Sequence, residues 1–175
     1  MTIISCQCGQ VRLDATGTPI LTASCFCHSC QEAGRRFEAL PGAPPFLDAD
    51  GGTSVVVYRK DRVRCVDGQE QLEEYRLKPD SPTRRVVAAC CGTPMFGDFT
   101  KGHWLPLYRR RFGADAPGIE MRMMTKDQRA DVILADDIPN HGGYPASFLV
   151  KMILAWIAMG LRRPAGPTAR PAGQD

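Results

Sequence analysis

The chain places seven of its eight cysteines in three short stretches: Cys6-Gln7-Cys8-Gly9, Cys25-Phe26-Cys27-His28-Ser29-Cys30 and Cys90-Cys91-Gly92. The eighth cysteine, Cys65, stands alone. Cys-x-Cys and Cys-x-x-Cys spacings let two thiolates converge on one zinc ion at about 2.3 Å, which is how proteins build zinc sites. Because the stretches lie far apart in the sequence, a metal site that draws on two of them would also hold distant strands together. The cysteines therefore bear on both the fold and the chemistry.

The length and composition indicate one globular domain. The 175 residues are 43% hydrophobic and 23% charged, which is enough to bury a single core. We expect one domain over residues 1–163 and a disordered tail over residues 164–175, which are rich in Pro, Gly and Ala. The net charge of +3 gives no reason to expect a nucleic-acid partner.

The first residues of the chain carry no basic region followed by a long apolar stretch, so no secretory signal is expected. We therefore expect a cytoplasmic protein. In that compartment thiols stay reduced, which leaves the cysteines available to a metal ion.

The first two thirds of the chain is patterned for β structure. Alternation of polar and apolar residues, or runs of Val, predict strands at Gln10–Asp14, Ser54–Tyr58, Arg62–Val66, Gln71–Leu77 and Arg84–Ala89. Turn residues separate these runs, and Asp67-Gly68 predicts a hairpin of Val63–Val66 with Gln69–Leu77. The predicted fold class is mainly β with a C-terminal helix.

The apolar segment from Phe148 to Met159 predicts that terminal helix, over about residues 145–160. Pro145 suits its first turn, where a missing N–H costs nothing. The segment is shorter than the roughly 20 residues that span a bilayer, and Lys151 interrupts it. We expect the helix to be buried or to pack against a partner rather than to lie in a membrane interface.

Cys6, Cys8 and Cys91 form a first candidate zinc site. Cys6 and Cys8 lie two residues apart at a predicted strand end, so their side chains point to one face. A glycine follows Cys8 and again Cys91, which lets the backbone turn tightly around an ion. Cys90 is the nearest candidate for a fourth ligand, although adjacent cysteines chelate one ion only with a strained backbone. We expect this site to be structural.

Cys25, Cys27 and Cys30 offer three thiolates from one short segment. Three protein ligands and an open position are the arrangement of a catalytic zinc. Three thiolates leave the ion little positive charge, so it suits the exchange of sulfur ligands better than the activation of water. These cysteines are therefore candidate catalytic residues for a substrate with a thiol. The spacing leaves open a second structural site, completed by His28, Cys65 or another side chain.

Together these stretches resemble the glutathione-dependent formaldehyde-activating enzyme family, which also includes centromere protein V. The matching residues, within about the first 100, are Cys6-x-Cys8-Gly9-x-Val11, Cys25-x-Cys27-x-x-Cys30-Gln31 and Cys91-Gly92-Thr93-Pro94-Met95-Phe96. The resemblance implies a β-tent fold of antiparallel sheets pinned by zinc. It implies carbon–sulfur lyase chemistry on an S-hydroxymethyl thiol, with glutathione or its aldehyde adduct as the small-molecule partner.

The resemblance also distributes the cysteines between two ions. Cys25, Cys27 and Cys30 would hold a reactive zinc, and Cys6, Cys8 and Cys91 a structural zinc. The family usually has Cys-x-x-Cys-Gly in the last motif, whereas this chain has Ala88 and places Cys90 next to Cys91. The stretch Ala88-Ala-Cys-Cys-Gly-Thr-Pro94 looks like a divergent bacterial branch of the family.

Two alternatives to an enzyme stay open. One is a non-catalytic zinc module that binds a protein partner through the apolar helix. The other is a thiol or metal sensor, since the adjacent Cys90 and Cys91 could oxidise. The oligomeric state also stays open, a homo-oligomer included.

Overall fold

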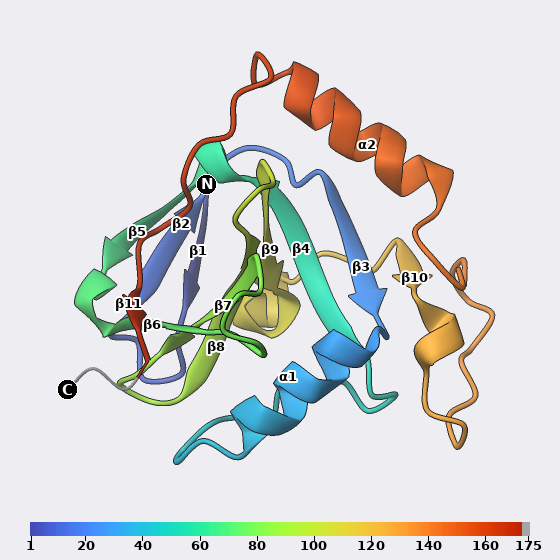
Figure 1. Cartoon of the computed structure of the whole chain (residues 1–175), viewed down its shortest axis with the longest axis horizontal. Coiled ribbons are helices and arrows are strands. Elements are labelled where there is room, and N and C mark those ends of the chain that lie inside the picture. Colours follow the sequence, from blue (N-terminus) through green and yellow to red (C-terminus); the bar gives the residue numbers. More distant parts are fainter. Residues whose placement is uncertain (173–175) are drawn as a thin grey trace.

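The computed structural model describes residues 1–172, and β-strands dominate it (Figure 1). The strands are β1 (Thr2–Ser5), β2 (Arg12–Ala15), β3 (Leu21–Cys25), β4 (Thr53–Arg59), β5 (Val63–Asp67), β6 (Leu72–Tyr75), β7 (Thr83–Ala88), β8 (Thr93–Phe99), β9 (Trp104–Tyr108), β10 (Met121–Met123) and β11 (Arg170–Pro171). The α-helices are α1 (His28–Glu38) and α2 (Ala146–Ile157), and short 3-10 turns are η1 (Lys60–Arg62), η2 (Gln69–Gln71), η3 (Arg109–Asp115) and η4 (Thr125–Asp127). The predicted mainly β class is confirmed.

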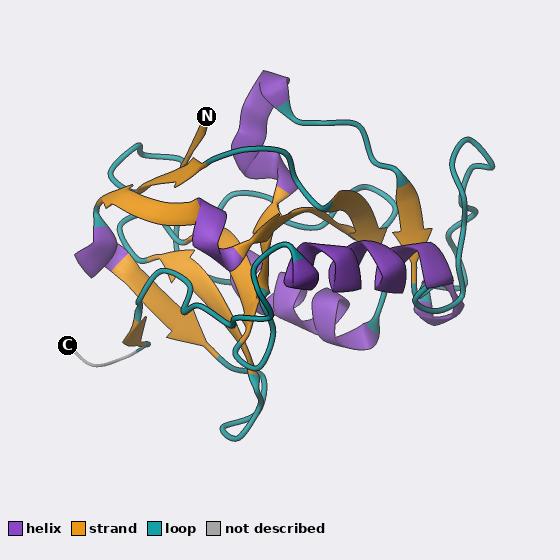
Figure 2. Ribbon diagram, turned by 90° about the horizontal axis from the view of Figure 1, so that it is seen from above, coloured by secondary structure: helices purple, strands orange, loops and turns teal. Residues whose placement is uncertain are grey.

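The strands form two sheets. A three-stranded sheet has the order β1-β2-β5, and an eight-stranded sheet has the order β10-β3-β4-β9-β8-β7-β6-β11. Neighbouring strands pair antiparallel except at the two edges of the larger sheet, where β10 runs parallel to β3 and β11 parallel to β6. Seen from above, both α-helices lie outside the strands (Figure 2). Each of the five predicted strands overlaps an observed one, namely β2, β4, β5, β6 or β7.

The predicted hairpin of Val63–Val66 with Gln69–Leu77 is wrong. β5 pairs with β2 in the three-stranded sheet, whereas β6 pairs with β7 in the eight-stranded sheet. Gly68 adopts a φ of +70°, and the 3-10 turn η2 follows it directly. The chain therefore crosses from one sheet to the other at this point instead of folding back along β5.

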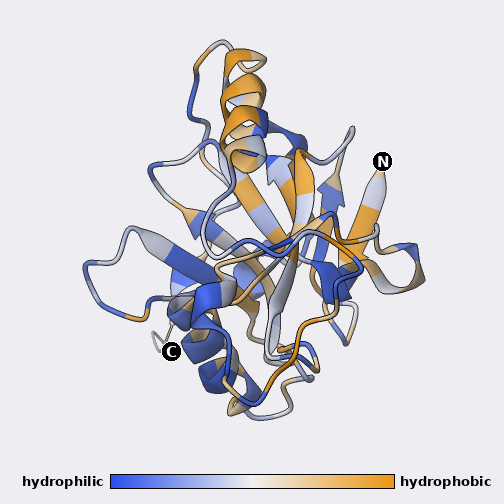
Figure 3. Cartoon of the chain, turned by 90° about the vertical axis from the view of Figure 1, so that its right-hand side faces the viewer, coloured by the Kyte–Doolittle hydropathy of each residue, from blue (hydrophilic) through white to orange (hydrophobic). Residues whose placement is uncertain are grey.

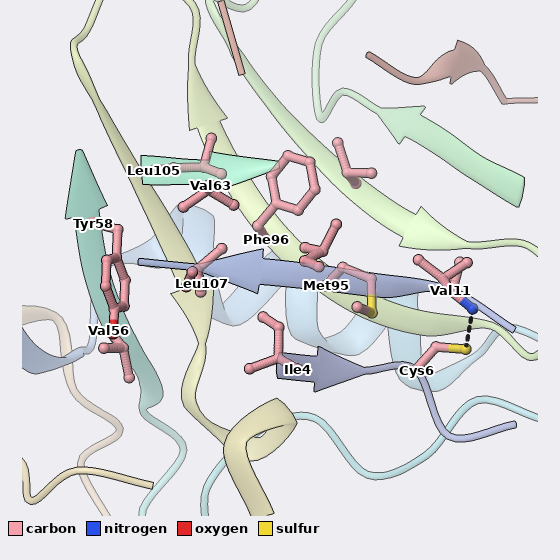
Figure 4. Packing of buried hydrophobic residues seen from close by; sticks show 14 of the residues in the cluster. Ile4, Cys6, Val11, Val56, Tyr58, Val63, Met95, Phe96, Leu105 and Leu107 are labelled. Atoms are coloured by element: carbon pink, nitrogen blue, oxygen red, sulfur yellow. Dashed lines mark hydrogen bonds between the residues drawn. The ribbon is translucent and has the colours of Figure 1, made fainter. Parts of the chain in front are cut away.

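The eight-stranded sheet is buried on both faces. On β4, Val56 and Tyr58 belong to the core between the two sheets, whereas Val55 and Val57 belong to the core beneath the helices. This follows from the two-residue period of a strand, which sends successive side chains to opposite faces. Figure 4 shows the first of these cores, which includes Ile4, Val11, Val63, Met95, Phe96, Leu105 and Leu107. The second includes Leu21, Ala33, Phe37, Phe46, Tyr108, Met121 and Met152.

Helix α2 lies within the predicted range of residues 145–160 and is anchored along one side only. Met152 and Met159 are 6% and 2% exposed. His103 Nε2–H donates to the carbonyl of Met152 at 2.9 Å, and its ring stacks on Trp156 with the centroids 5.7 Å apart. Among residues 1–172, no helix is both long and apolar enough to cross a bilayer.

Residues 164–172 differ from the predicted disordered tail. They return along the eight-stranded sheet, where Arg170 lies opposite Glu73 in the pairing of β11 with β6. Arg170 Nη2 is 2.9 Å from Glu73 Oε1. Main-chain pairing at a sheet edge requires no hydrophobic pattern, so composition alone did not reveal it. Residues 173–175 of the predicted tail lie outside the described residues.

A buried ion pair connects the end of β8 with the turn after β4. Lys60 Nζ lies 2.7 Å from the carboxylate of Asp98, and both side chains are 2% exposed. Lys60 also donates to the carbonyl of Phe99 at 3.1 Å, and Arg84 Nε donates to Asp98 at 2.9 Å. Removal of one partner would leave the other charge buried without compensation.

We therefore predict that Asp98→Ala lowers the free energy of unfolding by about 3–5 kcal/mol, as measured by urea denaturation. The control is Asp131→Ala, which breaks the exposed pair with Arg129 and should leave stability almost unchanged because water screens both groups. Equal effects of the two substitutions would contradict a structural role for the buried pair.

Candidate metal centres

Four cysteine sulfurs converge where the loop between β1 and β2 meets the turn between β7 and β8. The Sγ atoms of Cys6, Cys8, Cys90 and Cys91, here called the four-sulfur group, all lie within 4.8 Å of one another. Cys6 Sγ is 3.5 Å from Cys8 Sγ and 3.8 Å from Cys90 Sγ. Cys90 Sγ is 3.3 Å from Cys8 Sγ and 3.8 Å from Cys91 Sγ. A tetrahedral zinc with Zn–S bonds of about 2.3 Å needs sulfurs about 3.8 Å apart, so these residues fit that ion.

Two tight turns present these sulfurs. Gly9 has a φ of +80° and Gly92 a φ of +63°, a left-handed conformation that glycine adopts without steric cost. The Gly9 N–H donates to the carbonyl of Cys6 at 3.1 Å. The Val11 N–H donates to Cys6 Sγ at 3.3 Å, as Figure 4 shows, and this contact favours the thiolate form of the sulfur.

The family resemblance places a cysteine at position 88, where this chain has an alanine followed closely by Cys90 and Cys91. Ala88 ends β7 inside the core with no exposed surface, and its carbonyl accepts from the Cys91 N–H at 3.3 Å. Thr93, which the sequence analysis quoted within the last motif without a role of its own, places Oγ1 3.0 Å from Cys91 Sγ. Although burial acts to raise it, the pKa of Cys91 is lowered to about 6 by hydrogen bonds from Thr93 and from Cys8.

The second group lies where β3 meets α1. Cys25 is the last residue of β3 and is 8% exposed, Cys27 precedes the first residue of α1, and Cys30 lies in the first turn of that helix. The three Sγ atoms, here called the three-sulfur group, lie within 4.8 Å of one another. Helix α1 was not predicted, although its buried Ala33 and Phe37 have the i, i+4 spacing of a helix face.

Hydrogen bonds within the three-sulfur group favour the thiolate form of Cys27. Hydrogen bonds from Cys25 and Cys30, together with one from Ser29 Oγ at 3.3 Å, lower the pKa of Cys27 to about 2. The hydrogen bond to Cys27 raises the pKa of Cys25 to about 12, and Cys25 and Cys27 likewise raise the pKa of Cys30. The N-terminus of α1 adds a favourable dipole for a thiolate at this position.

Hydrogen bonds and an ion pair link the start of α1, which carries Cys27 and Cys30, to the turn after β10. Gln31 Nε2 donates to the carbonyl of Phe26 at 2.5 Å and to that of Asp127 at 2.7 Å, which ties α1 to the turn after β10. His28 Nε2 lies 3.7 Å from Asp127 Oδ1. Partial burial, and then the charge of the three cysteines, raises the pKa of Tyr144 to about 12. This phenol therefore keeps its proton at neutral pH.

A basic hollow of about 190 Å³ runs beside α1. Its polar lining consists of three arginines, Arg36, Arg76 and Arg85, and its apolar lining includes Phe37 and Tyr75. Arg85 is 6% exposed, and its Nη2–H donates to the carbonyl of Ser29 at 3.2 Å in the first turn of α1. Arg85 thus links the lining of the hollow to the segment that carries Cys27 and Cys30.

Neither side chain that could complete a second structural site joins the three-sulfur group. Cys65 lies on β5 in the three-stranded sheet, where its Sγ is 3.1 Å from the carbonyl of Asp67. His28 follows Cys27 directly, yet its ring nitrogens are not within the 4.8 Å group. Among residues 1–172, no fourth Cys, His, Asp or Glu ligand atom belongs to it.

Comparison with known proteins gives a family match over the N-terminal part of the chain. Residues 1–40 match the sequence model of a family described as glutathione-dependent formaldehyde-activating enzyme, and this range includes Cys6, Cys8, Cys25, Cys27 and Cys30. No curated protein matches the chain. A crystal structure of a Rhodobacter sphaeroides protein, a Northeast Structural Genomics target, is similar with a TM-score of 0.47 and 15% sequence identity. The similarity covers 65% of this chain and 89% of that chain.

We predict that the purified protein binds two zinc ions and that the two groups differ in what they support. Cys91→Ser should remove one ion and unfold the protein, because structural zinc contributes on the order of 10 kcal/mol to small metal-dependent folds. Cys27→Ser should remove the other ion and leave the fold intact. Elemental analysis and circular dichroism measure both effects.

Cys65→Ser is the matched control and should retain both ions, because Cys65 belongs to neither group. A Cys27→Ser variant that still holds two ions would contradict the assignment of the three-sulfur group.

Proposed function

We propose that the protein is a zinc-dependent carbon–sulfur lyase that acts on a thiol or on its S-hydroxymethyl adduct. In this proposal the three-sulfur group holds a reactive zinc ion and the four-sulfur group holds a structural one. The observation that carries the proposal is the difference between the two groups, since one offers four sulfurs and the other three. The match of residues 1–40 to the glutathione-dependent formaldehyde-activating enzyme family supports the same reaction class.

The number of ligands separates the two roles. Four thiolates complete the tetrahedral coordination of zinc and leave no position for a substrate, whereas three thiolates leave one position open. A thiol substrate is the ligand that best suits such a position, because zinc with several thiolates exchanges sulfur readily. When bound there, zinc supplies a Lewis acid that stabilises the substrate sulfur as a thiolate at neutral pH.

Residues of this chain act on the second reactant, the aldehyde. Formation of the adduct joins the substrate sulfur to the carbonyl carbon of an aldehyde, the carbonyl oxygen gains a proton, and the reverse reaction releases both molecules. Tyr144, which is 53% exposed, is the candidate donor to that oxygen: partial burial, and then the charge of the three cysteines, raises its pKa to about 12, so the phenol keeps a proton to donate. Its hydroxyl stabilises the negative charge that the oxygen acquires.

The basic hollow beside α1 provides a binding place for the remainder of the substrate. Guanidinium groups recognise carboxylates with paired hydrogen bonds, and the aromatic lining accommodates the apolar part of an organic molecule. A thiol that carries carboxylates, as glutathione does, matches the three arginines of this hollow. Arg85 joins the hollow to the segment of Cys27 and Cys30.

A non-catalytic zinc module that binds a protein partner is the second candidate. The exposed apolar side of α2 favours it. It requires a fully coordinated, inert ion in each occupied group, whereas the enzyme requires one ion with an exchangeable ligand.

The enzyme hypothesis predicts turnover of small thiols with aldehydes, followed by loss of the free thiol or by NMR of the adduct. Cys27→Ser should abolish turnover while the fold survives, and Tyr144→Phe should lower kcat by roughly tenfold or more through loss of one hydrogen bond to developing charge. Cys65→Ser should keep full activity. Absence of turnover with every thiol tried would refute the proposal in favour of the zinc module.

The role of the hollow is tested with adjacent residues on α1. Arg36 and Arg35 both form ion pairs with Glu32, but only Arg36 lines the hollow. Arg36→Gln should raise KM for a thiol with carboxylates by roughly tenfold and leave KM for an uncharged thiol unchanged. Arg35→Gln should change neither value. An equal rise of KM for both thiols would contradict recognition of carboxylates in the hollow.

A further inference from the structure

Helix α2 presents a row of exposed aliphatic side chains. Their exposed fractions lie between 51% and 60%, and the residues, here called the apolar face, are Leu149, Val150, Ile153, Leu154, Ile157 and, just beyond the helix, Leu161. Steps of three and four residues align them along one stripe of the helix. Figure 3 shows α2 as a hydrophobic helix that projects from the rest of the chain. Single exposed aliphatic residues are ordinary, but a contiguous row marks an interaction surface.

The helix cannot turn this face toward the core. Met152 and Met159 are buried on its opposite side, and His103 fixes the carbonyl of Met152. Trp156 stacks on the same histidine. The apolar face therefore stays outside in the folded chain.

Basic side chains border the apolar face along one flank. A hollow of about 350 Å³ between α2 and the loops of the smaller sheet is lined by Arg59, Arg62 and Lys151, together with Leu154 of the apolar face. Arg59 pairs with Asp61, and Lys151 contacts Glu120. Within residues 1–172, no carboxylate forms an ion pair with Arg62, so positive charge remains in this hollow.

The C-terminal end of α2 carries two further arginines. Arg162 and Arg163 line a second hollow of about 300 Å³ with Met159 and Asp61, and the carboxylate of Asp61 pairs with Arg59. The guanidinium of Arg163 lies 5.0 Å from the ring centroid of Trp156. In the part of the chain that the structure describes, neither arginine has a carboxylate partner.

Contrary to the expectation from the sequence, α2 is exposed along one side, and we propose that it docks the protein flat on the surface of an anionic lipid bilayer. An interfacial helix of this kind combines apolar side chains, which enter the boundary between headgroups and acyl chains, with Lys and Arg, which contact the phosphates. The apolar face supplies the first part, and the hollow of Arg62 and Lys151, which Leu154 of that face also lines, supplies the second beside it. Arg162 and Arg163 follow at the C-terminal end of the helix. A helix of 12 residues is too short to cross the bilayer but long enough to lie on it.

The charges favour a lipid surface over a second copy of the chain. A twofold dimer brings the same patch of both copies together, so Arg62, Arg162 and Arg163 of both copies would gather at the rim of one interface. Like charges at such a rim repel each other. An anionic bilayer instead neutralises them.

The test is sedimentation of the purified zinc-loaded protein with vesicles of phosphatidylcholine, alone or mixed with an equal amount of phosphatidylglycerol. The protein should sediment with the mixed vesicles and not with phosphatidylcholine alone, and added salt should weaken binding because it screens the phosphates. Light scattering without vesicles should report a monomer.

Two pairs of substitutions separate the apolar and the basic contributions. Ile153→Ser with Ile157→Ser should reduce partitioning by roughly tenfold or more. Arg62→Gln with Arg163→Gln should reduce it by roughly fivefold for each arginine. Ile133→Ser and Arg129→Gln, exposed residues outside α2 and its hollows, should change nothing. Arg163 contacts the ring of Trp156, and the other substituted side chains make none of the packing contacts described above. Circular dichroism checks that each variant is folded.

Three results would overturn the proposal. The first is no sedimentation with the mixed vesicles. The second is sedimentation that neither pair of substitutions reduces. The third is a dimer in solution that Ile153→Ser with Ile157→Ser dissociates, which would assign the apolar face to a second copy of the chain.

Discussion

The two sheets of this protein meet at the convergence of Cys6 and Cys8 with Cys90 and Cys91. The first two sulfurs come from the loop between strands of the smaller sheet, and the other two from a turn of the larger sheet more than 80 residues later. Closing a loop of this length costs conformational entropy, which many weak contacts in the core must otherwise offset. A single ion held by four thiolates would fix both turns at once. With both turns held in place, the core shared by the two sheets could pack beside them.

Cysteine sulfurs also converge where β3 meets α1. There the sulfurs come from one segment, so the group links no distant strands and stability depends on it less. Its surroundings also differ. The N-terminus of α1, the phenol of Tyr144 and the arginine-lined hollow beside the helix place dipoles, a proton and positive charge around three sulfurs. These features are the basis of the proposal that this group binds an anionic thiol rather than serving as a structural junction.

The sequence predicted the groups of cysteines better than it predicted the path of the chain between them. Cysteine spacing reports local geometry, so Gly9 and Gly92 could be assigned to tight turns, and the structure places Cys90 in the same group as Cys91. Strand pairing depends on contacts that no local pattern contains, which is why Asp67-Gly68 suggested a hairpin where the chain crosses between sheets. The sequence did not predict helix α1, because most of its residues are polar and only Ala33, Gly34 and Phe37 are buried.

Very short strands lie at both edges of the eight-stranded sheet. β10 and β11 contain three and two residues and lie at the two edges of the eight-stranded sheet. An open sheet edge exposes unpaired N–H and C=O groups to which the strands of other molecules can add. Short parallel strands at both edges satisfy part of β3 and β6 while offering almost no length for such growth. Arg170 and Pro171 of β11 thereby limit the edge of β6 that is open to other molecules, although they add little to the core.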